Sequence, residues 1–324
     1  MTLRALSLRD LDGASEPHLR SLLEFLHGVG HHFVPPSPAT HRRVLQRDPE
    51  REARTLRDVF GWSLAFSPDL LPGRLLDVLR RGGLLAEEEG RLRSRVRVAS
   101  LEGNLFLHSA FPTTEADAVF FGPDTYRFAS FLREELAGAP AAGGVLVDIG
   151  TGSGAGAVVA CDLVRPARAI LTDINPAALS LARVNTSQAQ CEVELVLGEG
   201  LEGVEGSLDV VIANPPFIAG DEGRPYRDGG DLHGARISLD WARAAVDRLA
   251  PDGRLLLYTG SAIVNGVDRF RRAVEAMLAP GPFDVGYREL DPDIFGEQLS
   301  DPAYADVERI AAVGLTVRRR GNAA

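Results

Sequence analysis

The pattern of hydrophobic and polar positions divides the chain into two parts. In the first part, Glu16–Gly28 carries leucines at a helical spacing, and Leu75–Arg81 forms a second apolar helix that ends before two glycines. Arg91–Ala99 instead alternates arginines with apolar residues, which is the period of a strand, and Asn104–His108 can pair with it as a hairpin. Residues 1–112 therefore predict a mostly helical N-terminal domain for substrate recognition, either winged-helix-like or a helical cap joined by a hairpin to the next domain.

In residues 113–324, short apolar runs alternate with helical segments. This alternation is typical of a sheet whose strands are connected by helices, so we expect a second domain of α/β class. The predicted strands are Val145–Ile149, Ala169–Thr172, Glu192–Leu197, Leu208–Ala213, Arg254–Thr259, Phe283–Glu289 and Val313–Arg319.

A glycine-rich turn follows the strand Val145–Ile149 and precedes an apolar helix. Gly150, Gly152 and Gly154 permit a tight turn and the close approach of a ligand to the backbone. The N-terminus of the helix adds free N–H groups and the positive end of a dipole. Asp148 stands at the end of the strand, where a carboxylate faces the crevice above a sheet. The turn alone also fits the dinucleotide fingerprint of a nicotinamide-dependent oxidoreductase.

The next three strands also end in polar residues. Asp173 follows the second strand, at the distance expected of an acid that accepts the hydroxyls of a ribose. Glu199 follows the third, and the fourth ends in Asn-Pro-Pro-Phe, residues 214–217. Each has a plainer alternative, because Asp173 can be a helix cap, Glu199 part of a turn, and Asn-Pro-Pro a simple loop.

With Asp-x-Gly-x-Gly-x-Gly at 148–154, then Asp173, then Asn-Pro-Pro-Phe at 214–217, the chain resembles the class I S-adenosylmethionine methyltransferases that modify planar amino groups. This group includes the release-factor glutamine methyltransferases and the small-domain methyltransferases of rRNA and DNA. Over roughly Val119–Arg318, the resemblance implies a Rossmann-like seven-stranded sheet with an antiparallel hairpin at its edge, and S-adenosylmethionine as cofactor. The implied cofactor-binding residues are Asp148, Gly150, Gly152, Gly154, Asp173, Glu199 and Asn214.

The same resemblance implies that Asn214, Pro215 and Phe217 form the methyl-acceptor site. The side-chain oxygen of Asn214 and the carbonyl after it accept hydrogen bonds from the amino group, which holds the nitrogen in line with the methyl group. Pro215 stiffens the turn, and the ring of Phe217 offers a flat face for a planar acceptor.

Two classes of acceptor fit these residues. Pro123-Asp124-Thr125 is similar to a Pro-acid-Thr segment of the release-factor enzymes, and together with the net charge of −10 it slightly favours a glutamine amide in a protein. Phe217 stands where the glutamine enzymes typically have Tyr, and arginines crowd residues 42–57, which favours the exocyclic amine of a base in RNA or DNA. A small molecule is a third alternative. The loop Ile218–Leu232 adds Arg224, Tyr226, Arg227 and Asp228 as candidate acceptor contacts.

Composition limits the partners and the location that we expect for this protein. An acidic chain is not a natural sequence-independent nucleic-acid binder. No stretch is long and apolar enough to span a membrane, and the N-terminus lacks a signal-peptide core, so we expect a cytoplasmic location and no membrane partner. No Cys/His cluster has the spacing of zinc ligands, so we expect no metal. Cys161 and Cys191 are expected to be buried free thiols.

Overall fold

The computed structural model describes residues 4–9, 11, 13–88, 90–138, 143–219, 229, 232–279 and 281–321. The chain folds into two compact units. The first comprises residues 1–126, 152–155 and 175–191, and the second comprises residues 127–151, 156–174 and 192–324. The predicted domain boundary between residues 112 and 113 stays a prediction.

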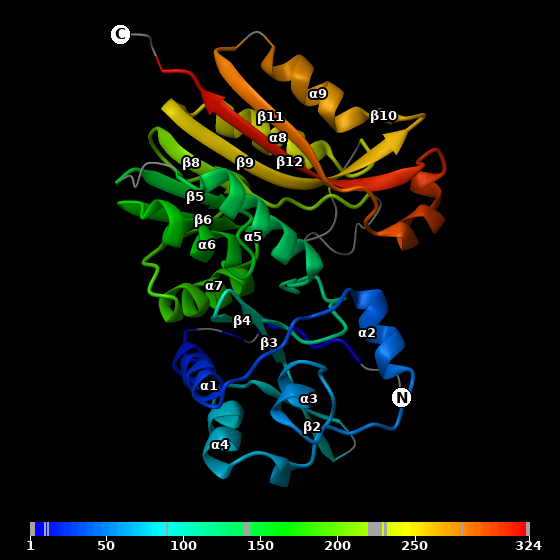
Figure 1. The fold of residues 1–324 in the computed structure, drawn as a ribbon. Coiled ribbons are helices and arrows are strands. Elements are labelled where there is room, and N and C mark those ends of the chain that lie inside the picture. Colours follow the sequence, from blue (N-terminus) through cyan, green and yellow to red (C-terminus); the bar gives the residue numbers. More distant parts are fainter. Residues whose placement is uncertain are drawn as a thin grey trace. The chain divides into compact units, whose positions relative to one another are not determined.

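The second unit is built on one twisted sheet (Figure 1). Its strands are β5 Val145–Ile149, β6 Arg168–Asp173, β7 Glu194–Leu197, β8 Leu208–Ala213, β9 Leu249–Val264, β10 Val267–Asp268, β11 Phe283–Asp291 and β12 Arg309–Arg319. Seven of them lie in the order β11-β12-β9-β8-β5-β6-β7, and the short β10 pairs with the end of β9. β12 is antiparallel to both β9 and β11, whereas β9, β8, β5, β6 and β7 are parallel. The predicted α/β class, with a seven-stranded sheet and an antiparallel hairpin at its edge, is confirmed.

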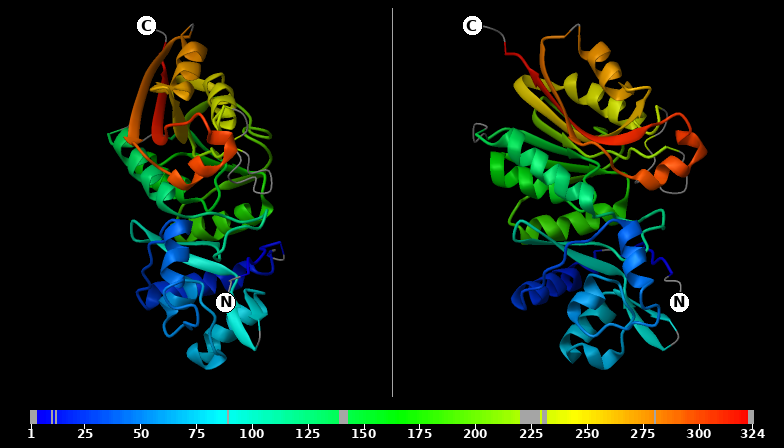
Figure 2. Two further views of the ribbon diagram at one scale, coloured as in Figure 1. Left: turned by 90° about the vertical axis from the view of Figure 1, so that its right-hand side faces the viewer. Right: turned by 45° about the vertical axis from the view of Figure 1, so that its right-hand side comes forward.

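Helices cover both faces of this sheet (Figure 2). They are α5 Pro123–Leu136, α6 Ala155–Val164, α8 Arg236–Val246 and α9 Arg269–Leu278, with the 3-10 turns η2 Gly296–Ser300 and η3 Pro302–Tyr304 between β11 and β12. On one face, apolar side chains of α8 and α9 pack on Leu255, Leu257 and Val313. On the other face, a Cβ at Gly314 would lie 2.5 Å from the ring of Phe131 on α5, because successive residues of a strand point to opposite sides.

The first unit contains helices and two separate hairpins. Its elements are α1 Glu16–Gly28, α2 Pro38–Leu45, α3 Leu56–Phe60, η1 Pro68–Leu70, α4 Gly73–Arg81, β1 Leu85–Glu88, β2 Arg91–Ser94, β3 Val96–Leu101, β4 Asn104–Ser109 and α7 Pro176–Gln188. The predicted single strand Arg91–Ala99 is wrong in one respect, because it breaks at Arg95 into β2 and β3. Each half has a different partner, β1 for β2 and β4 for β3, and sequence alternation does not reveal a change of partner.

Neither cysteine is a free thiol. Cys161 and Cys191 are both disulfide-bonded, so the expectation of two buried free thiols is wrong. The separation of the two cysteines along the chain carries no information about whether they are bonded.

A side-chain amide on α7 joins three segments of the first unit. The oxygen of Asn185 accepts the Leu107 N–H at 2.9 Å, and its nitrogen donates to the Leu107 carbonyl at 3.0 Å and to the Ser153 carbonyl at 2.9 Å. Asn185 therefore supplies the partner for the edge of β4 and also holds a carbonyl of the glycine-rich turn. The residue is buried, so none of these groups has water as an alternative partner.

We expect Asn185→Leu to lower the free energy of unfolding by about 2–5 kcal/mol, because it leaves buried peptide groups of Leu107 and Ser153 without a partner. Urea denaturation measures this loss. Gln188→Leu, which replaces a half-buried amide on the same helix, is the matched control and should cost about 1 kcal/mol or less. Equal losses in the two variants would contradict the role of Asn185.

The first unit also buries several cationic or titratable side chains together. Among the described residues, neither ring nitrogen of His108 has a hydrogen-bond partner, and the same is true of Nδ1 of His41. Arg97 is buried beside them and donates from Nε to the Ser109 carbonyl at 2.9 Å. Burial, with the charge of Arg97, lowers the pKa of His41 to about 3 and lowers the pKa of His108 well below its usual value. Both histidines are therefore neutral when the unit is folded.

These histidines make the unit sensitive to acid. A buried His that stays neutral contributes stability that is complete above its unfolded pKa of 6.5 and is lost as the pH falls below it, because only the unfolded chain takes up the proton. Between pH 7.5 and 5.5 each should cost about 1.4 kcal/mol. Urea denaturation at both pH values should show a smaller loss for His108→Leu than for the unchanged protein. His27→Leu, at an exposed site on α1, should keep the full loss. An unaltered pH dependence in His108→Leu would exclude this explanation.

Candidate functional site

The parallel strands of the second unit bring polar residues to one edge of the sheet. Ile149 is in register with both Ala213 of β8 and Thr172 of β6, so the residues that follow, Gly150, Asn214 and Asp173, leave neighbouring strands side by side. The carboxyl ends of parallel strands are where open α/β sheets bind their ligands. The structure thus gathers the sequence-predicted strand-end residues at a single edge.

The glycine-rich turn after β5 has the backbone that the sequence predicts. Gly150, Gly152 and Gly154 have φ values of 65°, 54° and 79°, a left-handed conformation that other residues rarely adopt. A Cβ at Gly152 would meet nothing within 4 Å, so this position is open space beside the backbone. The missing side chains therefore permit the turn, and at Gly152 they also leave space beside the backbone.

Asp148 holds this turn together. Its Oδ2 accepts the Thr151 hydroxyl at 2.7 Å and the Ala157 N–H, in the first turn of α6, at 3.1 Å. The carboxyl is buried, and burial, opposed by these hydrogen bonds and assisted by the nearby Asp173, raises its pKa to about 7. The contacts of Asp148 are thus with the turn itself, and a direct contact with a cofactor stays a prediction.

The loops after β6 and β7 lie beside this turn. The half-buried Asp173 ends β6, and its carbonyl accepts the Gly198 N–H at 3.1 Å. Thr172 joins both neighbours, because its carbonyl accepts the Thr151 N–H at 3.0 Å and its hydroxyl donates to the Gly200 carbonyl at 2.7 Å. Glu199 is exposed in the loop after β7. Asp173 and Glu199 are therefore held at the same edge as Asp148.

Asn214 and Phe217 differ in their exposure. Asn214 is half-buried, and within the described ranges its amide makes no hydrogen bond to another residue. Pro215 is buried. The residue Phe217 is only 8% exposed. A Cβ at Gly260 would come within 2.4 Å of its ring, and the ring meets Phe295 edge-on at 5.5 Å. Asn214 is thus available to a ligand, whereas little of the Phe217 face is open.

Sequence reasoning missed the residues that surround this motif. The segment between β11 and β12 supplies Phe295, whose φ of 54° is left-handed, and the buried Tyr304, whose hydroxyl accepts the Ala219 N–H at 2.7 Å. The carboxylate of Asp306 accepts a hydrogen bond from His233 Nε2 at 2.9 Å. The one available signal was length, since the two predicted strands are separated by far more residues than a hairpin turn needs.

Two further sequence expectations concern the methyl acceptor. The candidate acceptor contacts Arg224, Tyr226, Arg227 and Asp228 lie outside the described residues. Pro123 begins α5, where Thr125 Oγ1 accepts the Gly122 N–H at 3.3 Å, and Asp124 is buried.

In the part of the chain that is described, no group of three or more His, Cys, Asp or Glu residues could hold a metal ion, and no helix is long and apolar enough to cross a membrane.

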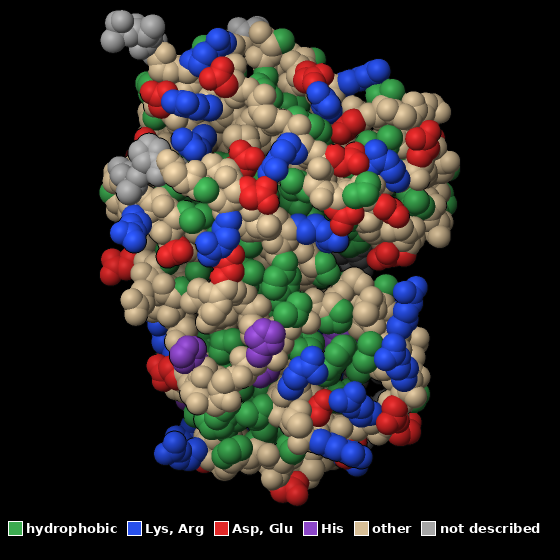
Figure 3. Space-filling model, viewed as in Figure 1, with side chains coloured by type: hydrophobic (Ala, Val, Ile, Leu, Met, Phe, Trp, Pro, Cys, Tyr) green, Lys and Arg blue, Asp and Glu red, His purple; other side chains and the backbone are tan. Residues whose placement is uncertain are grey.

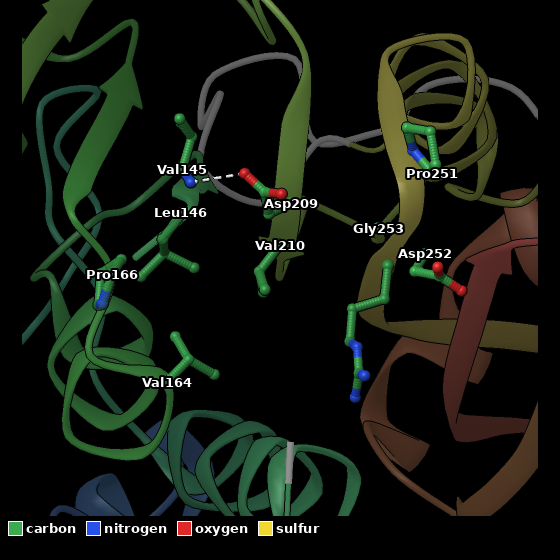
Figure 4. Close-up of a pocket in the computed structure, with 11 residues that line it drawn as sticks. Val145, Leu146, Val164, Pro166, Asp209, Val210, Pro251, Asp252 and Gly253 are labelled. Carbon is green, nitrogen blue, oxygen red and sulfur yellow. Dashed lines mark hydrogen bonds between the residues drawn. The ribbon is translucent and has the colours of Figure 1, made fainter. Parts of the chain in front are cut away.

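A cavity of about 160 Å³ lies at the opposite, amino-terminal edge of the strands (Figure 4). Val145, Leu146, Val164 and Val210 are among the residues that line it, and Asp209 accepts the Val145 N–H there at 2.7 Å. None of the sequence-predicted site residues lines it. The candidate site is therefore the carboxyl edge and not this cavity.

Part of the chain is similar to known methyltransferases. Residues 117–263 match the model of the methyltransferase small domain. The chain is 32% identical over 178 residues to a release factor glutamine methyltransferase of Deinococcus radiodurans, covering 52% of this chain and 63% of that protein. It is 32% identical over 122 residues to ribosomal RNA small subunit methyltransferase C of Ectopseudomonas mendocina, covering 33% of this chain and 35% of that protein. The chain thus spans less than two thirds of the length of these curated relatives.

Among solved structures, Trm5b from Pyrococcus abyssi aligns with a TM-score of 0.49 and 16% identity, over 72% of this chain and 61% of that one.

The raised pKa of Asp148 predicts how the stability of the protein depends on pH. Because the folded pKa of about 7 exceeds the ordinary 3.8, the contribution of this carboxyl to stability is complete below pH 3.8 and is lost as the pH rises through 7. Asp148→Asn cannot ionise but keeps an oxygen acceptor for the turn. We expect the variant to be more stable than the unchanged protein at pH 8, by at least about 2 °C in Tm, with a smaller difference at pH 5. A difference that does not vary with pH would contradict the buried-carboxyl account.

Proposed function

Because residues 117–263 carry a methyltransferase small domain, we propose that this protein is an S-adenosylmethionine-dependent N-methyltransferase that acts on a planar amino group, with a glutamine amide of a protein as the favoured acceptor. The observation that carries the proposal is the half-buried Asn214 amide, which ends β8 beside the glycine turn and makes no hydrogen bond to another described residue. The proposal includes a cytoplasmic location and neither a membrane nor a metal as partner.

The residues at the edge fit this cofactor. The open space at Gly152 accommodates a ligand that lies directly on the backbone of the turn. Asp173 stands where an acid can accept the hydroxyls of a ribose, and the exposed Glu199 can accept from an adenine amine. When bound, S-adenosylmethionine supplies an electrophilic methyl group on a sulfonium.

The role of Asn214 follows from the chemistry of the acceptor. The nitrogen lone pair of an amide or an aromatic amine is delocalised, so this nitrogen is a weak nucleophile. The Asn214 oxygen and the Pro215 carbonyl accept hydrogen bonds from the amino group, which orients the lone pair and stabilises the positive charge that develops on nitrogen. Pro215 has a fixed φ, so these acceptors stay aimed without reorganisation. The proton leaves after transfer, to Asn214 or to water.

The packing of Phe217 supports a glutamine amide over a base. A purine gains affinity by stacking on an open aromatic face. Here Gly260 and Phe295 cover the ring of Phe217, which leaves 8% of the residue exposed. A primary amide needs only the hydrogen bonds at Asn214. The relative from Deinococcus radiodurans, a release factor glutamine methyltransferase, adds weight to this choice.

Methylation of an exocyclic amine in RNA or DNA is the second candidate, and the likeness to a ribosomal RNA methyltransferase is what supports it. Figure 3 shows Asp and Glu side chains interspersed with Arg side chains over the C-terminal part of the face drawn, with no region of one sign there to attract a polyanion. A nicotinamide-dependent oxidoreductase accounts for the glycine turn and Asp173, but for neither Asp148 nor the Asn-Pro-Pro-Phe run.

A methyl-transfer assay with labelled S-adenosylmethionine on separated protein, RNA, DNA and metabolite fractions tests the proposal. We expect label in the protein fraction, recovered as N-methylglutamine after digestion. Label recovered only as a methylated nucleoside would replace the favoured acceptor by the second candidate. Calorimetric binding of NAD without binding of S-adenosylmethionine would overturn the methyltransferase proposal.

Asn214→Ala should lower kcat by roughly a hundredfold or more, because it removes one preorganised acceptor that acts mainly in the transition state. Cofactor affinity, measured by calorimetry, should change little. Phe217→Ala should act on the KM for the acceptor, with a smaller effect for a glutamine amide than for a base. Turnover close to normal in a folded Asn214→Ala protein would refute the amino-methyltransferase mechanism.

A further inference from the structure

The indole of Trp241, on α8, lies between two glycines of the cofactor edge. A Cβ at Gly150 would come within 2.5 Å of Trp241 Cη2, and a Cβ at Gly200 would lie 3.5 Å from Trp241 Nε1. The six-membered ring therefore lies against the turn after β5, and the edge with the N–H lies toward the loop after β7. The first glycine of the turn is needed for this contact as well as for its φ of 65°.

This position places the ring beneath the end of β6. In the sheet order β5-β6-β7, a side chain that reaches from the β5 turn to the β7 loop passes the end of β6 between them. Thr172 lies near the end of β6. Its carbonyl accepts the Thr151 N–H, and its hydroxyl donates to the Gly200 carbonyl. Asp173 is the next residue. The loops after β5 and β7 thus meet the same indole, and Thr172 at the end of β6 is hydrogen-bonded to both loops.

Trp241 is packed on one side and open on the other. It is half-buried and contacts the apolar core under α8, but its Nε1 makes no hydrogen bond to any residue for which the structure gives a position. Ile174, directly after Asp173, is 57% exposed at the same edge. An aromatic face, an unused N–H donor and an exposed aliphatic side chain form the kind of surroundings that suit a planar heterocycle.

We propose that Trp241 forms the wall of the cofactor pocket against which the adenine ring lies. The inference rests on the proposed function, and it assigns to this chain a residue that the motifs do not contain. Adenine is bonded directly to the ribose. A ribose held at Asp173 therefore places the base close to that residue and against the indole of Trp241.

Two tryptophans in the chain, Trp62 and Trp241, allow a direct test by fluorescence. Trp62→Phe leaves Trp241 as the only indole, and Trp241→Phe leaves Trp62, which lies in the first unit. S-adenosylhomocysteine and adenosine should each change the emission of Trp62→Phe saturably, whereas methionine alone should not. The emission of Trp241→Phe should stay constant under all three.

Calorimetry with S-adenosylhomocysteine provides a second measurement. Loss of the stacked ring in Trp241→Leu should weaken binding roughly ten- to a hundredfold, and Trp241→Phe, which keeps a ring, should weaken it less. Melting curves confirm that each variant is folded. If the unchanged protein binds but Trp241 emission is constant or Trp241→Leu binds equally well, the inference fails and the methyltransferase proposal stands. If the unchanged protein binds no S-adenosylhomocysteine, the proposed function itself fails.

Discussion

The carboxylate of Asp148 is the interaction on which the candidate site depends. The chain leaves β5 at a point where three left-handed glycines give it little conformational preference of its own. Hydrogen bonds from Thr151 and Ala157 to one carboxylate oxygen fix the path from the strand into α6. Burial of an acid carries a cost, which appears as the raised pKa of Asp148. The turn is therefore ordered by a group that is itself unfavourable to bury, as is common where strain or charge serves a site.

The same turn is held from a second direction. Asn185 donates to the Ser153 carbonyl while it pairs with both peptide groups of Leu107 on β4. The N-terminal hairpin and the glycine turn thus share one buried amide. The proposed acceptor side is arranged differently, because aromatic side chains from distant segments, Phe295 and Tyr304, pack around the Asn-Pro-Pro-Phe run. Hydrogen bonds organise the proposed cofactor side, and aromatic packing organises the proposed acceptor side.

Much of this could be predicted from the sequence, because the signals are local. The strand Val145–Ile149, the glycine turn and the strand Leu208–Ala213 depend on residues that are neighbours in the chain, and parallel pairing then brings their ends to one edge. Partners distant in the chain could not be predicted. Trp241 has the spacing of an ordinary core residue of α8, and nothing local connects it with Gly150. The break of the strand at Arg95 and the bonded state of Cys161 could not be predicted for the same reason, because both depend on partners that are distant in the chain.

The position of α7 in the first unit has a consequence for biosynthesis. Its residues Ala177, Leu181 and Val184 belong to the same apolar core as Leu19 and Leu22 of α1, although they come far later in the chain. A ribosome therefore releases the N-terminal helices well before the residues that complete their core, and this core closes only after β5 and β6 have been made. For the same reason, exchange of the N-terminal segment for another would change the apolar surface on which α7 packs.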